Sequence, residues 1–93
     1  MYVLEPAAFD KPEDMTPEQQ AVSAEHFEYL KKLHADGVLV VAGRTDGAEM
    51  GIVVFESEDE AAARTLMAAD PAVAKGLMRA RLYPYRLALL RGE

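Results

Sequence analysis

Along this 93-residue chain, short continuous apolar runs alternate with longer segments in which apolar residues recur every three or four positions, as on one face of a helix. Runs rich in apolar and β-branched residues predict strands over residues 2–4, 38–43, 51–56 and 80–90; Pro84 in the last marks a sheet edge or a bulge. Helices are predicted over residues 17–35 and from about residue 58 to 69. The order β-α-β-β-α-β predicts an α+β, ferredoxin-like domain, in which an antiparallel sheet carries both helices on one face.

Local signals mark both ends of the first helix. Thr16 is suited to the N-cap position, Pro17 to the first helical position, and Gln19 completes a capping box. Gly37 follows the last helical residues and predicts the C-terminal stop, because glycine readily adopts the left-handed conformation found there.

The second helix is bounded by a serine and a proline. Ser57 and Glu60 predict a capping box at its start. Asp70 precedes Pro71, and a residue before proline is disfavoured in the helical region, so the helix is expected to end near Ala69. A short helical turn is expected to restart at Pro71.

Two predicted strands carry apolar residues on both faces. Residues 38–41 and 52–55 are apolar without alternation, and Asp46-Gly47 predicts the turn between these strands. Two helices cover only one face, so the other face would be a large exposed apolar patch. A second copy of the chain is the simplest cover, which predicts a homodimer through the sheet face. The alternative is a monomer whose short strands tolerate an apolar edge.

Composition narrows the class of protein. The length predicts a single domain over residues 1–93, and the absence of cysteine removes disulfides and thiolate chemistry. The net charge of −6, without a basic cluster, argues against nucleic-acid binding. No apolar run is long enough for a membrane span, and the N-terminus lacks the pattern of a signal peptide. We therefore expect a cytoplasmic protein that binds neither nucleic acid nor membrane.

One histidine lies on the apolar side of the first helix. At 100° per residue His26 falls in one arc with Val22, Tyr29, Leu30 and Leu33, while the charged residues occupy the opposite side. A buried imidazole needs a hydrogen-bond partner. His26 is therefore either a satisfied core residue or a general acid or base oriented by a carboxylate.

Asp70 is the carboxylate best placed to partner His26. Most other acidic residues lie on solvated faces, whereas Asp70 stands where the second helix ends. In the predicted layout the helices lie side by side, so the end of one approaches the flank of the other. Asp before proline is also an ordinary N-cap for a short helix, and the two roles can coexist.

Four further side chains are candidates for binding a substrate. Arg44 follows a strand end, where ligand-facing residues are frequent; its alternative is a solvated turn charge. Arg81 and Tyr83 share one face of the predicted last strand, so either is a candidate for a pocket rim; the alternative is packing. Ser23 precedes His26 by about one helical turn.

No metal or cofactor is expected at this site. The two histidines, His26 and His34, are eight residues apart on one helix, which separates them by about 12 Å along its axis. The chain also lacks a glycine-rich phosphate loop in a strand-to-helix context.

Three segments of the sequence resemble the YciI-like, or YCII-related, family. They are H-F-E-Y-L-x-x-L-x-x-x-G-V-L-V-V-A-G from His26 to Gly43, F-E-S-E-D-E-A followed by A-D-P-A-V-A-K-G-L within residues 55–77, and Y-P-Y at residues 83–85. The resemblance implies a dimeric α+β barrel built from ferredoxin-like chains. It also implies a His–Asp dyad in a cleft, at positions that match His26 and Asp70 here.

The resemblance favours a cofactor-independent enzyme that moves a proton on a small organic molecule. Elimination of the lyase or dehydrochlorinase kind, isomerisation and hydrolysis all fit such chemistry. One alternative is a non-catalytic ligand-binding or interaction module of the same fold. Another, borrowed from other dimeric α+β barrels, is cofactor-free oxygenation or haem binding through His26.

The chain departs from the family pattern at two positions. Many relatives carry Arg three residues before the histidine, where this chain has Ser23, and many have Pro where this chain has Arg44. These departures do not change the expected fold, but they leave open which substrate the site binds.

Overall fold

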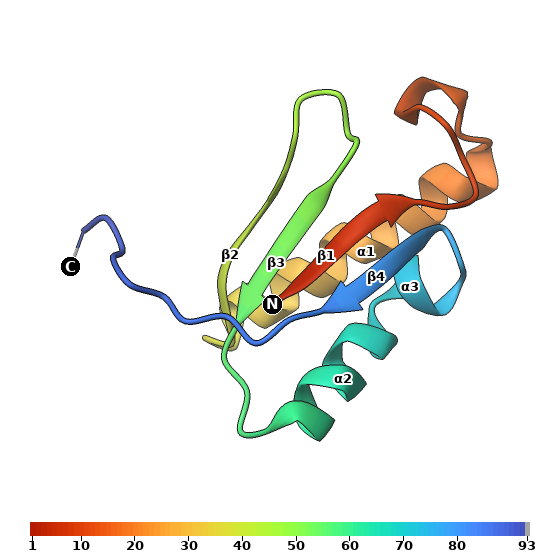
Figure 1. Ribbon diagram of the computed structural model, residues 1–93. Coiled ribbons are helices and arrows are strands. Elements are labelled where there is room, and N and C mark those ends of the chain that lie inside the picture. Colours follow the sequence, from red (N-terminus) through yellow and green to blue (C-terminus); the bar gives the residue numbers. More distant parts are fainter. Residues whose placement is uncertain (93) are drawn as a thin grey trace.

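A computed structural model of the chain describes residues 1–92, so Glu93, the last residue of the predicted domain, lies outside the described residues. Its elements are β1 (Tyr2–Pro6), the 3-10 turn η1 (Pro12–Asp14), α1 (Pro17–Ala35), β2 (Leu39–Arg44), β3 (Gly51–Phe55), α2 (Glu60–Ala69), α3 (Pro71–Ala74) and β4 (Met78–Leu82) (Figure 1). The predicted order β-α-β-β-α-β is confirmed. Within the described range, no helix has the length and apolar character that crossing a bilayer requires.

The four strands form one antiparallel sheet in the order β2-β3-β1-β4. Tyr2 on β1 pairs with Val53 on β3 and Leu82 on β4, and Val53 pairs with Ala42 on β2. The two halves of the chain are therefore interleaved, because each β-α-β unit receives a strand of the other half between its own strands. Figure 1 shows α1 crossing behind the sheet.

The hydrophobic core lies between the sheet and the helices. Its buried members are Tyr2, Leu4 and Val53 from the sheet with Leu30 and Leu33 from α1. Partly buried residues packed against them include Leu39 and Ala42 from β2, and Leu66, Met67, Val73, Met78, Ala80 and Leu82 from α2, α3 and β4. Because all three helices contribute to this one core, they cover one face of the sheet, as predicted.

The first helix begins and ends at the predicted residues. Thr16 Oγ1 accepts a hydrogen bond from the Gln19 N–H at 3.1 Å, and Gln19 Oε1 accepts one from the Thr16 N–H at 3.0 Å. Gly37 follows the helix with φ +75°, the left-handed conformation that glycine tolerates best. The capping box and the glycine stop are both confirmed.

The predicted hairpin turn is also confirmed. The Ala48 N–H donates to the Thr45 carbonyl at 2.9 Å, which places Asp46 and Gly47 at the two central positions. Ala48 itself has φ +57°, so the left-handed residue of this loop is an alanine.

The predicted start of the second helix is wrong by two residues. The N-cap is Asp59, whose carboxylate accepts from the Ala62 N–H at 2.7 Å, while Ser57 donates its hydroxyl to the Asp59 carbonyl. A carboxylate is a strong acceptor, and its charge is favourable at the positive end of the helix dipole. Asp59 therefore takes the position that the sequence pattern assigned to Ser57.

The last strand ends earlier than predicted. β4 stops at Leu82, and Tyr83 adds only one reciprocal pairing with Met1, each nitrogen donating to the other residue's carbonyl at 2.8 Å. Pro84 has no N–H to continue the ladder. Residues 83–92 leave the sheet, and Figure 1 shows the segment passing the ends of β3 and β2 before it extends away from the body.

The face of the sheet opposite the helices is largely apolar. By strand register Val3, Val41, Ile52 and Val54 lie there, on the side away from the core. Val41 is 45% exposed. The described helices leave this face open.

The two candidate caps of α2 give a stability prediction. Asp59→Ala should lower the free energy of unfolding by about 1 kcal/mol, because it removes the acceptor for a helix N–H. Ser57→Ala should change it far less. Urea unfolding followed by circular dichroism measures both, and equal losses in the two variants would contradict the assignment of the cap.

Candidate active site

The structure brings His26 and Asp70 together across 44 residues of sequence. His26 lies in the middle of α1, and its Nδ1 is 2.7 Å from Oδ1 and 2.8 Å from Oδ2 of Asp70. Asp70 is fully buried, whereas the His26 side chain keeps 14% of its surface exposed. An ionised carboxylate only accepts, so Nδ1 carries the hydrogen and donates it.

Two further donors complete the surroundings of the carboxylate. The Tyr2 hydroxyl donates to Oδ2 at 2.7 Å, and the Ala72 N–H donates to Oδ1 at 2.9 Å. The second bond makes Asp70 the N-cap of α3. The capping role and the pairing with histidine therefore coexist in one side chain.

Tyr2 is a member of this network that the sequence analysis missed. It pairs in the centre of the sheet, and its ring is fully buried with an edge-to-face contact to Phe55 at 5.8 Å. A buried phenol requires a partner for its hydroxyl, and that requirement was the available signal. Burial raises the pKa of Tyr2 well above its ordinary value, and the hydrogen bond and negative charge of Asp70 raise it further.

Neighbouring contacts hold α1 against the segment that carries Asp70. The Tyr29 hydroxyl donates to the Leu66 carbonyl at 2.7 Å, and Lys75 pairs with Glu25 at 2.8 Å. Burial, and then the charge of Asp70, raise the pKa of Tyr29. These contacts on either side of His26 limit sliding of the helix and so orient the imidazole.

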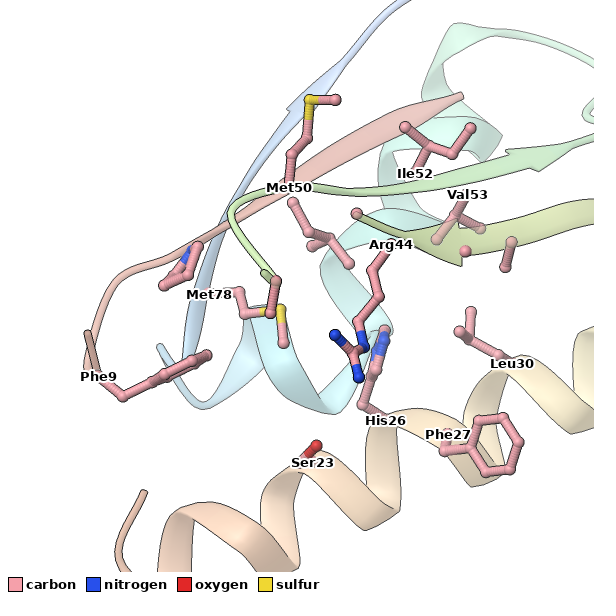
Figure 2. Close-up of a pocket in the computed structure, with 16 residues that line it drawn as sticks. Phe9, Ser23, His26, Phe27, Leu30, Arg44, Met50, Ile52, Val53 and Met78 are labelled. Atoms are coloured by element: carbon pink, nitrogen blue, oxygen red, sulfur yellow. The ribbon is translucent and has the colours of Figure 1, made fainter. Parts of the chain in front are cut away.

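The other ring nitrogen of His26 is open to a cavity. Among residues 1–92, no fully buried side-chain nitrogen or oxygen lacks a hydrogen-bond partner. Nε2 of His26 forms no hydrogen bond with any described residue. It therefore cannot be one of the fully buried atoms and retains accessible surface. His26 lines a cavity of about 390 Å³ between α1 and the end of the sheet near the β2–β3 loop (Figure 2).

The cavity is mostly apolar with three polar side chains. Ser23, His26 and Arg44 supply the polar groups. Apolar lining residues include Leu4, Pro6, Phe9, Phe27, Leu30 and Met78. In Figure 2 the Arg44 guanidinium extends from the sheet toward the imidazole. An apolar chamber with a few convergent polar groups is the usual form of a small-molecule site.

Two of the predicted site residues do not line this cavity. Arg81 alternates with the inward-facing Ala80 and Leu82, so its side chain lies on the opposite face of the sheet. Tyr83 follows the end of β4 and lines a separate hollow near Met1, at the other end of the sheet. Within the single chain Arg81 and Tyr83 therefore do not share a pocket with His26, contrary to the expectation from the sequence.

No group of three or more His, Cys, Asp or Glu side chains is placed to hold a metal ion within the described part of the chain. The geometry of the cavity supplies an imidazole backed by a carboxylate. The Nδ1–H bond to Asp70 fixes the ring, and Nε2 faces the cavity as an acceptor for a proton.

Comparison with known proteins places the chain in a family. The YCII-related domain matches residues 5–84, which is most of the chain, and the protein belongs to the YCII-related family. This confirms the resemblance found in the sequence. A search of the curated proteins gave no significant match.

One similar solved structure is 5-chloro-2-hydroxyhydroquinone dehydrochlorinase (TftG) from Burkholderia phenoliruptrix AC1100, in complex with 2,5-dihydroxybenzoquinone. The two chains superpose with a TM-score of 0.56 over 91% of this chain and 94% of the other, at 18% identity. At that identity the likeness establishes the shared fold.

The raised pKa of Tyr2 predicts a loss of stability in alkali. Below about pH 10 both the folded and unfolded states keep the phenolic proton. At higher pH the unfolded chain releases it while the folded chain retains it, so each such tyrosine lowers the free energy of unfolding by up to about 1.4 kcal/mol per pH unit.

Tyr2→Phe should therefore be less stable than the wild type at neutral pH but lose stability less steeply above pH 10. Urea unfolding across that range measures the slope. Tyr85→Phe removes an exposed phenol and serves as the control. A slope in Tyr2→Phe as steep as in the wild type would contradict the buried phenol–carboxylate bond.

Proposed function

We propose that this protein is a cofactor-independent enzyme that catalyses proton transfer on a small organic substrate. His26 is the general acid–base group, and Asp70 holds it in position. The observation that carries the proposal is that one imidazole nitrogen is bonded to a fully buried carboxylate while the other faces an apolar cavity. This is the arrangement that acid–base catalysis by histidine needs.

In the proposed step, Nε2 takes a proton from a C–H or O–H group of the substrate. The imidazole becomes an imidazolium, and the Asp70 carboxylate offsets its positive charge across the Nδ1–H bond. In an isomerisation the proton returns to another atom of the same substrate. In an elimination the electron pair of the broken C–H or O–H bond forms a new double bond, and the leaving group departs with its own pair.

The reaction type draws support from the similar structure. TftG is a dehydrochlorinase whose structure holds 2,5-dihydroxybenzoquinone, a single-ring compound. An elimination of that kind requires a base beside a small ring. A cavity of about 390 Å³ beside His26 is of a suitable size for one ring.

The test is a panel of small hydroxylated and chlorinated ring compounds, 5-chloro-2-hydroxyhydroquinone among them. Chloride release reports elimination, and exchange of substrate hydrogen for deuterium in heavy water reports proton transfer. His26→Gln keeps a donor for Asp70 but lacks the base, so the rate should fall by about 10²–10⁴-fold. Asp70→Asn should also lower the rate.

His34→Gln is the matched control, because His34 is an exposed residue on the same helix. It should leave the rate unchanged. A rate in His26→Gln equal to that of the wild type would refute the proposed role. Ligand binding without turnover of any compound, unaffected by His26→Gln, would instead favour a binding module.

We further propose that the protein is a homodimer through the open face of the sheet. Val3, Val41 and Ile52 form an apolar patch there, next to Val54, which is already buried in the single chain. Residues of both charge signs, Glu5 on β1 with Arg79 and Arg81 on β4, lie beside the patch. A two-fold axis brings such a patch against itself and lets opposite charges meet. A domain of this length also gains core by pairing.

Light scattering coupled to size-exclusion chromatography tests this proposal. The wild type should have the mass of two chains, and Val41→Lys should have the mass of one, because the new charge would be buried at the interface. Ala24→Lys, on the exposed side of α1, should remain dimeric. A monomeric wild type, or a dimeric Val41→Lys variant, would exclude this interface.

A further inference from the structure

We infer that the substrate of the His26 cavity is a small organic acid whose carboxylate is bound by Arg44. The inference builds on the proposed function of this site and adds the chemical class of the ligand. It comes from the placement and charge of Arg44, from the apolar walls of the cavity, and from the position of Arg44 relative to His26.

The strand register directs Arg44 into the cavity. Arg44 pairs with Gly51 in the same row of the sheet that holds Leu4 and Ala80, two residues of the helix-facing side. A Cβ at Gly51 would lie 3.8 Å from the Cβ of Arg44 and 3.9 Å from that of Leu4. The glycine therefore leaves space on the cavity side, next to the stem of the arginine.

The charge of Arg44 has no carboxylate partner in the described part of the chain. The ion pairs formed within residues 1–92 all involve other residues. Its Nη1 donates to the backbone carbonyls of Thr45 at 3.3 Å and Asp46 at 3.2 Å. Glu49, on the same loop, instead accepts from the Thr45 hydroxyl at 2.9 Å. The guanidinium therefore keeps its other donors for a ligand, while Asp10, Glu13, Asp46 and Glu49 line a second hollow that Arg44 also borders.

The rest of the cavity suits the hydrocarbon part of an acid. Apart from Ser23 and His26, the side chains that line it with Arg44 are apolar. A guanidinium presents parallel donors that match the two oxygens of a carboxylate. Apolar walls exclude water from a bound ligand and strengthen this attraction. A ligand held in this way is anchored at the sheet, with its body between the anchor and the imidazole.

Arg44 and His26 approach the same space from opposite walls. Arg44 extends from the end of β2 and His26 from α1, and both line the cavity drawn in Figure 2. Binding the acid group at Arg44 leaves Nε2 free to face another part of the substrate. Arg44 is thus a specificity-determining residue, and His26 keeps the acid–base role.

Matched acids and amides test the inference, with benzoate and benzamide, and phenylacetate and phenylacetamide, as probes. Amide and imidazole NMR titrations of the full chain measure each dissociation constant. In the wild type each acid should bind about tenfold more tightly than its amide, a difference of about 1.4 kcal/mol. The resonances of His26 and Gly51 should shift on binding.

Arg44→Met keeps most of the apolar stem and removes the charge, so the acids should then bind no better than the amides. Arg86→Met, at an exposed arginine that does not line this cavity, should retain the preference. Binding of neither acid, or equal binding of acid and amide by the wild type, would overturn the inference. A preference that persists in Arg44→Met would also overturn it.

These outcomes separate this inference from the proposed function. Acid and amide that shift the His26 resonance equally would show that the cavity binds ligands without an anion site. The catalytic role of His26 is tested independently by the turnover of His26→Gln.

Discussion

A carboxylate without solvent exposure is the feature on which the rest of this structure depends. Burying an ion is costly unless hydrogen bonds surround it. Asp70 meets this condition with donors from β1, α1 and α3: the Tyr2 hydroxyl, the His26 imidazole and the Ala72 N–H. The carboxylate therefore ties together parts of the chain that are far apart in sequence, at the place where the sheet meets the helices.

The same interaction connects the fold to its chemistry. Since Asp70 is bonded to Nδ1, the tautomer and the orientation of His26 are set, and Nε2 is directed to the cavity. The cavity lies at the end of the sheet near the β2–β3 loop, so residues of that hairpin form its other wall. Ser23 and Arg44 both line it.

Local signals explain which parts of the fold the sequence predicted. The capping box at Thr16, the stop at Gly37 and the Asp46-Gly47 turn depend on a few adjacent residues, and the structure confirms all three. The helical stripe placed His26 toward the sheet, and the Asp-Pro step placed Asp70 at a helix end. Together with the element order, these two facts made a contact between them one of the open interpretations, and the resemblance to the YCII-related family favoured it.

The features that sequence reasoning missed depend on competition or on distant contacts. Tyr2 bonds a residue 68 positions away, and nothing in its own strand indicates that partner. Asp59, and not Ser57, is the N-cap of α2. The spacing of the capping motif alone does not tell which of the two residues takes that position. Arg81 and Tyr83 were misplaced because the face of a strand follows from its register and its end. A change of one residue in the register of a strand, or in the position where it ends, changes which side chains reach a cavity.

The most direct test of this account is nitrogen NMR of the His26 imidazole, which identifies the ring nitrogen that carries the hydrogen. We expect a hydrogen on Nδ1, a strongly hydrogen-bonded Nδ1 signal that Asp70→Asn alters, and an Nε2 signal that responds to ligands. A hydrogen on Nε2, with Nδ1 unprotonated toward Asp70, would contradict the ionised carboxylate and, with it, the proposed role of His26 as a base.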